Sequence, residues 1–348
     1  MSGKRGGWTG WFRRLRPIAP YLIGLAVIVG LVLAVSPGRF ATAARRFDPA
    51  FAPIVAGLCL VYYLLQGLRW QPLLQAVGAR LRLRDTMVLN LAGQSTGLLP
   101  GGELTRAVLV SEVAHIEVGA AVATITVQEL LYTVLIIAAA VPGALHHSLA
   151  AIGVVVALAG VVGVTVILTV EAVFARLMTV VEKVPVLRSF GADAAALQRE
   201  TVTLLRRRDT LWWSAVSALQ AVVTITMFWV VVEAIDPGRL SWPDAAFVYA
   251  VAHIAGAVSL GPGGLGGFEA ACIGMLVAVG IPFGVAVAAS LLQRTADKGL
   301  GTVYGGAAYA LARRRYDLKH ARVVRHGQRR RRRRSSVDRA GAPGGGEA

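Results

Sequence analysis

Two short stretches decide the fold of this chain: STGLLPGGELTRA, from Ser95 to Ala107, and VSLGPGGLGGFEA, from Val258 to Ala270. Each interrupts apolar sequence with a Pro-Gly-Gly break and places a glutamate a few residues later. Proline and glycine break a helix, and the backbone groups that the break frees need polar partners that lipid cannot offer. The repetition indicates two related structural units in one chain.

The composition is that of a chain surrounded mainly by lipid. Hydrophobic residues make up 55% of the 348 residues, charged residues 16%, and the mean hydropathy is +0.61. A helix needs about 20 apolar residues to cross the hydrocarbon core of a bilayer. The stretches of roughly that length are 18–36, 50–68, 117–141, 149–170, 210–235 and 283–311.

The arginines and lysines of short loops predict the orientation, because basic loops stay in the cytoplasm. Segment 1–17, stretch 69–84 and the end of link 171–209 are basic, while loop 37–49, with three arginines, departs from the pattern. The loops with almost no basic residues, predicted to lie outside, are 142–148 and 236–243. Six crossings then place both termini of a multi-pass plasma membrane protein in the cytoplasm.

The two break segments, 85–101 and 243–264, fall outside these six crossings. Each lies between two crossings that meet at one face, so we expect it to enter and leave the membrane by that face. Such re-entrant elements are stable only when they are buried in protein or line a polar cavity. The alternative is that both are ordinary crossings with a kink, which would give eight spans.

An internal repeat supports the pairing of the breaks. A shift of 165 residues aligns VGAAVATITVQEL (118–130) with FGVAVAASLLQRT (283–295), and Gln128 then meets Gln293. The predicted topology gives the two copies opposite orientations. We therefore expect an all-α polytopic membrane protein with an inverted-topology repeat of two halves, about six crossing helices and two re-entrant broken segments. Such folds place a binding site near the midplane and alternate its access.

The predicted domains are a membrane domain over 18–312 and two basic cytoplasmic ends, 1–17 and 313–348. Repeat 1 covers about 18–141 and repeat 2 about 149–312. The stretch from 312 onward holds thirteen Lys and Arg residues against three acidic ones, which accounts for ten of the seventeen net positive charges. A basic, disordered tail beside a membrane helix favours the anionic headgroups of membrane lipids, so nucleic acid is not the expected partner.

Charged residues near the breaks are the candidate site, because a charge inside a membrane must be paired or face a polar cavity. Glu103 and Arg106 are three residues apart and form a possible ion pair on one helix face. Arg294, Asp297 and Lys298 also share a helix face, with one cation in excess. A phosphate headgroup would suit that excess charge. The alternative is an ion-pair network that only holds the helices together.

Other polar residues complete the set of candidates. Glu129 and Glu269 could carry protons, although pairing with Arg294 is the simpler fate, and Asn90 could bond the broken backbone or contact substrate. No Cys or His cluster has metal-ligand spacing, and no cofactor is expected. The residues assigned to the helix breaks are Gly97, Pro100, Gly101, Gly102, Gly261, Pro262, Gly263, Gly264 and Gly266.

These motifs resemble the lysylphosphatidylglycerol synthase transmembrane region, also called the flippase-like membrane family. The resemblance rests on NLAGQSTGLLPGGELTRA, GPGGLGGFEA and GIPFGVAVAASLLQR, and it spans about 20–312. It implies translocation of a lipid or lipid-linked substrate with two re-entrant helices. The family pattern has a Glu-Arg pair in the helix after the first break, where this chain reads Gln128-Glu129-Leu130, so the first half lacks that arginine.

The expected function is therefore that of a flippase-like translocator of a phospholipid or lipid-linked intermediate with an anionic phosphate headgroup. No stretch is long and polar enough for the soluble aminoacyl-transfer domain of bifunctional members, so a lipid-modifying enzyme is a possible partner. Two alternatives are a membrane-embedded enzyme acting on a lipid phosphate and a scaffold that does not transport. The enzyme is disfavoured because no acid/base or metal constellation accompanies the motifs.

Overall fold

The described part of the protein is entirely helical. The computed structural model describes residues 45–97, 104–146, 159–160, 162–163, 165–167, 169–181, 191–206, 213–259 and 266–316. Within these residues there are eleven α-helices and no strand. The predicted crossing at 18–36, most of the one at 149–170, and the tail from 317 onward lie outside the described residues. Residues 313–315, which were assigned to the disordered tail, are helical.

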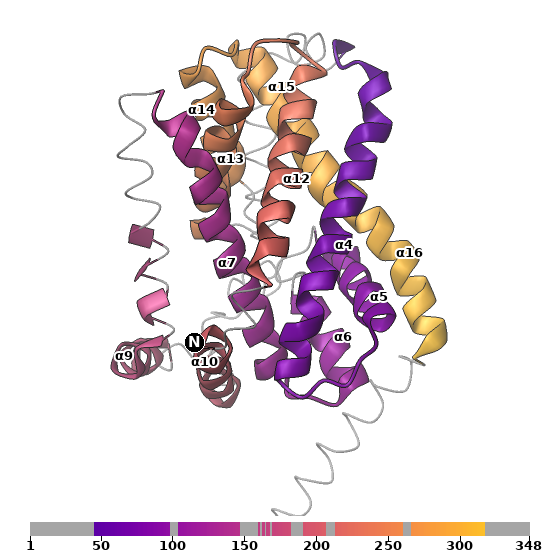
Figure 1. Ribbon diagram of the computed structural model, residues 1–348, viewed down its shortest axis with the longest axis vertical. Coiled ribbons are helices and arrows are strands. Elements are labelled where there is room, and N and C mark those ends of the chain that lie inside the picture. Colours follow the sequence, from indigo (N-terminus) through magenta and orange to yellow (C-terminus); the bar gives the residue numbers. More distant parts are fainter. Residues whose placement is uncertain are drawn as a thin grey trace, which may run out of the picture.

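Three helices are long and apolar enough to cross a membrane: α4 (Ala52–Ala76), α7 (Val118–Ala144) and α12 (Ser214–Glu233). They confirm helices at the predicted segments 50–68, 117–141 and 210–235, although α4 extends eight residues further. A short 3-10 turn, η1 (Pro49–Phe51), precedes α4. The three helices run along the length of the bundle in Figure 1.

A fourth long helical path is interrupted by a wider turn. Helix α15 (Phe283–Arg294) continues through η5 (Thr295–Gly299), a π-helical turn, into α16 (Leu300–Arg315). The predicted segment 283–311 is thus helical throughout. Because a π-turn holds more residues than an α-turn, the residues after Arg294 do not keep the α-helical spacing on which the predicted face of Arg294, Asp297 and Lys298 depended.

Two pairs of short helices lie beside the long ones. Helix α5 (Leu83–Gly93) continues through the 3-10 turn η2 (Gln94–Thr96) and is followed by α6 (Leu104–Ala114). Helix α13 (Trp242–Val258) is followed by α14 (Gly267–Ala278). We call these pairs hairpin 1 and hairpin 2. An 11-residue helix such as α5 is about 16 Å long, roughly half of a bilayer core.

The hairpins occupy opposite ends of the bundle. Figure 1 shows α5 and α6 at the lower end and α13 and α14 at the upper end, with α4 and α7 extending from one end to the other. Each break therefore lies between two helices. The sequence prediction missed α6 and α14, because it ended the broken segments at 101 and 264, just after the Pro-Gly-Gly motifs.

Helices α7 and α16 each pack on the hairpin of the other half. A Cβ atom on Gly305 of α16 would overlap the backbone of Ser95 in hairpin 1. A Cβ atom on Gly143 of α7 would overlap the backbone of Pro243 at the start of hairpin 2. Close packing at these glycines joins the two halves into one bundle.

Two further helices, α9 (Glu171–Val181) and α10 (Gly191–Arg206), lie at the same end as hairpin 1 (Figure 1). The basic C-terminal ends of α10 and α16, with Arg206 and Arg315, are at that end too. At this end Asp85 of α5 pairs with Arg315, at 2.9 Å, and accepts a hydrogen bond from the Tyr316 hydroxyl.

Candidate functional site

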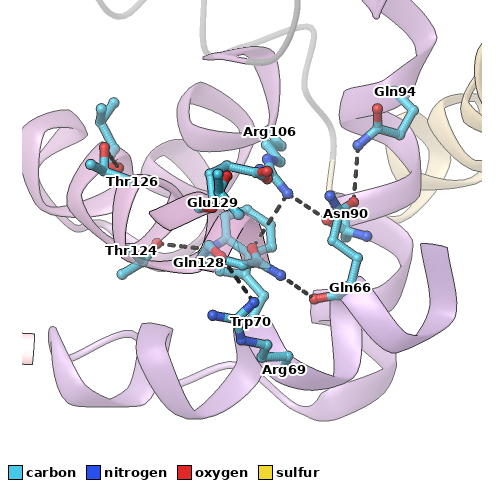
Figure 2. A network of polar contacts seen from close by, with 12 residues as sticks. Gln66, Arg69, Trp70, Asn90, Gln94, Arg106, Thr124, Thr126, Gln128 and Glu129 are labelled. Carbon is cyan, nitrogen blue, oxygen red and sulfur yellow. Dashed lines mark hydrogen bonds and ion pairs between the residues drawn. The ribbon is translucent and has the colours of Figure 1, made fainter. Parts of the chain in front are cut away.

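Arg106 is the centre of a buried polar network in the first half (Figure 2). It extends from α6, and its side chain is only 2% exposed. One Nη atom lies 2.9 Å from Oε1 of Glu129 on α7. The other lies 3.4 Å from Oδ1 of Asn90 and 3.5 Å from Oε1 of Gln128. The guanidinium also lies 5.5 Å from the ring centroid of Trp70, a cation–π contact.

The amide side chains around Arg106 are themselves held in place by hydrogen bonds. Gln128 donates from Nε2 to the backbone carbonyl of Gln66 at 2.8 Å. Asn90 donates from Nδ2 to the backbone carbonyl of Tyr63 at 3.0 Å, and Gln94 donates to the Gln66 side chain at 3.2 Å. The network joins α4, α5, α6 and α7 (Figure 2). Asn90 thus bonds intact helix α4 rather than a broken end.

The second half contains another ion pair. Nε of Arg294, at the end of α15, lies 3.3 Å from Oε1 of Glu269 on α14. The other Glu269 oxygen accepts a hydrogen bond from the backbone N–H of Gly266 at 2.7 Å. Gly266 has φ +87°, a conformation that favours glycine. Glu269 therefore caps the N-terminus of α14 just after the break and holds Arg294 at the same time.

The two ion pairs occupy equivalent places with their charges exchanged. The repeat aligns Glu129 with Arg294, both on the helix that follows a hairpin. Arg106 and Glu269 both lie early in the second helix of a hairpin, and each is followed by alanine. In the alignment the first half has no arginine at the position of Arg294. Its positive charge comes instead from Arg106 on hairpin 1. A contact between Arg106 and Glu103 was expected, but Glu103 is outside the described residues.

The pairs also differ in which charge is accessible. The Glu129 side chain is 37% exposed and its partner Arg106 is buried, whereas Glu269 is fully buried and Arg294 is 13% exposed. The more accessible member is thus the glutamate in the first pair and the arginine in the second.

The other predicted site residues are placed as follows. The hydroxyl of Tyr63 donates to the backbone carbonyl of Asp297 at 3.1 Å and lies 3.4 Å from its carboxylate. Lys298 is half-buried on the same π-turn. Of the break residues, the structure describes Gly97 and Gly266. Those outside the described residues are Pro100, Gly101, Gly102, Gly261, Pro262, Gly263 and Gly264.

A chain of aromatic rings connects the two halves. Tyr132 of α7 packs its ring against Tyr62 of α4 and, edge to face, against His253 of α13. Tyr249 stacks on His253 and also contacts Phe268, whose ring lies 5.8 Å from the Arg294 guanidinium. Sequence analysis missed this chain. Its only sequence signal is the presence of tyrosine and histidine within apolar helices.

The chain matches a known protein family over most of its length. The family model described as "Lysylphosphatidylglycerol synthase TM region" matches residues 21–305. That range includes both hairpins, both breaks and all four residues of the ion pairs. No curated protein matches the sequence.

Proposed function

The chain belongs to the lysylphosphatidylglycerol synthase TM region family, and from this premise we propose that it moves a phospholipid or lipid-linked intermediate across the membrane. The family name associates this membrane region with lipid modification. The chain is an integral, multi-pass membrane protein with helices long enough to span a bilayer. The proposed substrate has an anionic phosphate headgroup, and the proposed role involves no covalent chemistry.

One observation carries this proposal: two hairpins of shorter helices lie at opposite ends of the bundle, each with an ion pair to the helical path that follows it. This arrangement supports an inverted-topology repeat in which the hairpins are re-entrant. In such folds the site lies between the halves, and its access alternates when one half moves against the other. A lipid headgroup can then cross while its acyl chains stay in the bilayer.

Arg294 is the proposed anchor of the phosphate. Its side chain is 13% exposed, and a guanidinium can hold two phosphate oxygens at once, which a lysine ammonium cannot do. Lys298, four positions later on the π-turn, adds positive charge. The ion pair with Glu269 orients Arg294 before the headgroup arrives.

The basic ends of the chain have a supporting role in this proposal. With hairpin 1 on the cytoplasmic side, Arg206 and Arg315 lie in the cytoplasm, which agrees with the tendency of basic loops to stay there. Both termini are then cytoplasmic, and the tail meets anionic lipid headgroups. A lipid-modifying enzyme that supplies the substrate is the further proposed partner.

Lipid exchange in proteoliposomes tests the proposal. Fluorescent anionic and zwitterionic lipids are followed from the inner to the outer leaflet, with rates normalised to the monodisperse folded fraction. We expect Arg294→Lys to reduce exchange and Arg294→Gln and Glu269→Gln to reduce it further. Arg239→Gln is the matched control, because Arg239 is exposed on a loop. If Arg294→Gln and Glu269→Gln exchange lipid at the parental rate, the ion pair is only structural.

A further inference from the structure

His253 lies at a contact between the two halves and has no role in the proposed headgroup site. It is on α13 of hairpin 2, and its ring contacts two tyrosine rings. Tyr249 of the same helix stacks on it with 6.1 Å between the ring centroids, and Tyr132 of α7 meets it edge to face at 5.5 Å. A titratable side chain inside a membrane bundle is costly, so it is a functional candidate by default.

The contact with Thr133 of α7 decides which ring nitrogen carries a hydrogen. Nε2 of His253 lies 3.4 Å from the Thr133 hydroxyl oxygen. That hydroxyl has a single hydrogen, which it donates to the backbone carbonyl of Glu129 at 2.8 Å. Toward His253 the hydroxyl can therefore only accept, so Nε2 carries the hydrogen of the neutral ring. A further proton would be taken up at Nδ1.

Protonation at Nδ1 would strengthen this contact. Nε2–H would then donate from a cation, and hydrogen bonds with an ionised donor are shorter and about twice as strong as neutral ones. The distance of 3.4 Å leaves room for shortening, because N–H···O bonds usually measure about 2.9 Å. The face of the stacked Tyr249 ring also attracts a cation. The charge on His253 thus sets how tightly hairpin 2 is held to α7.

The charges around His253 favour a proton there. Helix α13 packs against α7, α12 and α14, and none of these four helices carries an arginine or a lysine. Their other titratable side chains are Glu129, Tyr132, Glu233, Asp244, Tyr249, Glu269 and Cys272. From the next helical path, Asp297 and Arg294 act electrostatically on Tyr249, and Arg294 is paired with Glu269. A proton on His253 would be the one positive charge on the four helices.

This charge acts where the two halves meet, since α7 belongs to repeat 1 and hairpin 2 to repeat 2. Alternating access requires the contact between the halves to change. We infer that His253 binds a coupling proton while hairpin 2 is held against α7 and releases it when the halves move apart, so that a proton gradient drives lipid movement. The proton adds to Nδ1 and leaves from the same atom, and no other covalent bond changes. This inference rests on the proposed transport function and adds its coupling ion.

A pH gradient across proteoliposomes tests the coupling. A trace of fluorescent phosphatidylglycerol is followed with the membrane potential clamped at zero, and the two sides are held at about pH 5.5 and about pH 7.5, on either side of the ordinary histidine pKa of about 6.5. The parental protein should distribute the probe unequally between the leaflets, with a ceiling of about 100-fold for one proton per lipid. His253→Gln should exchange the probe and leave it evenly distributed, because its amide can donate to Thr133 but binds no proton. His115→Asn, at an exposed position between α6 and α7 with φ +57°, is the matched control and should behave as the parental protein does.

Thermal unfolding in detergent separates this inference from the transport proposal. The stability that the charged contact adds is present below the ordinary histidine pKa of about 6.5 and is lost as pH rises above it. The parental midpoint should therefore fall more between these two pH values than that of His253→Gln. If this difference is seen without lipid exchange, transport is refuted and the proton site stands. If His253→Gln keeps the unequal distribution, if the parental protein exchanges the probe but distributes it evenly, or if the two midpoints change equally with pH, the inference is wrong.

Discussion

The two partners of the Arg106–Glu129 ion pair are expected to differ in what their removal costs. Arg106 is 2% exposed and Glu129 is 37% exposed. Glu129→Gln leaves a buried guanidinium with only neutral acceptors, Asn90 and Gln128, and the aromatic face of Trp70. Breaking a buried pair in this way costs about 3 kcal/mol, the low end of the usual range, because one partner is partly solvated.

Arg106→Gln removes the buried charge itself and leaves a carboxylate that solvent can reach. The remaining loss is mainly that of hydrogen bonds to a charged group, so we expect a destabilisation of about 1 to 2 kcal/mol. The carboxylate mutant should therefore be the less stable of the two, although its side chain is the more exposed one. Intuition based on burial alone predicts the opposite order.

Reversible unfolding in mixed detergent micelles, followed by tryptophan fluorescence, measures both variants. Trp70 contacts the guanidinium and reports on the site directly. Glu117→Gln is the control, because Glu117 is exposed at the start of α7 and makes no capping hydrogen bond. If Arg106→Gln proves less stable than Glu129→Gln, or if both match Glu117→Gln, the argument from unequal burial is refuted.

Two further predictions concern the packing and the cytoplasmic end of the bundle. Gly305→Ala should lower the unfolding midpoint strongly, because its Cβ would overlap the backbone of Ser95, while Gly306→Ala should leave it unchanged, since nothing lies within 4 Å of a Cβ there. Parallel thermal melts decide this, and equal midpoints would contradict the packing. Burial and the hydrogen bond to Asp85 raise the pKa of Tyr316 to about 12. The stability that this interaction adds is present below the ordinary tyrosine pKa of about 10 and is lost as pH rises toward 12. Asp85→Asn should lower the Tyr316 pKa, and ultraviolet titration against Tyr316→Phe would show an unchanged curve if the contact were absent.

The long helices could be predicted from sequence because bilayer thickness and apolar length set their bounds. Helix α7 begins one residue and ends three residues from its predicted limits. The second helix of each hairpin could not be predicted in this way. Helices α6 and α14 have 11 and 12 residues, too few for a crossing signal, and they begin within or next to glycine-rich stretches that resemble loop.

One of the two ion pairs could be predicted from the sequence, that of Glu269 with Arg294, and the other could not. Arg106, Glu129, Glu269 and Arg294 were identified because charge within apolar sequence is costly. The pairing of Arg106 was not predicted, because its partner is 23 positions away on another helix and sequence spacing reveals only neighbours on one helix. Which amide is hydrogen-bonded within the described residues has no sequence signal at all, since Gln128 and Gln293 have the same local pattern and only Gln128 has a partner there.

The two halves share an ion pair between hairpin and following helix, and they differ in which partner carries the positive charge. If only one polarity could hold a hairpin to its long helix, both halves would carry the same one. The structure has Arg106 on one hairpin and Glu269 on the other, so either polarity serves the structural task. Polarity instead decides which group each half presents, a carboxylate from Glu129 or a guanidinium from Arg294. The more accessible member is an arginine in the second pair only, so the proposed contact with a phosphate belongs to repeat 2 and repeat 1 is its structural counterpart in that proposal.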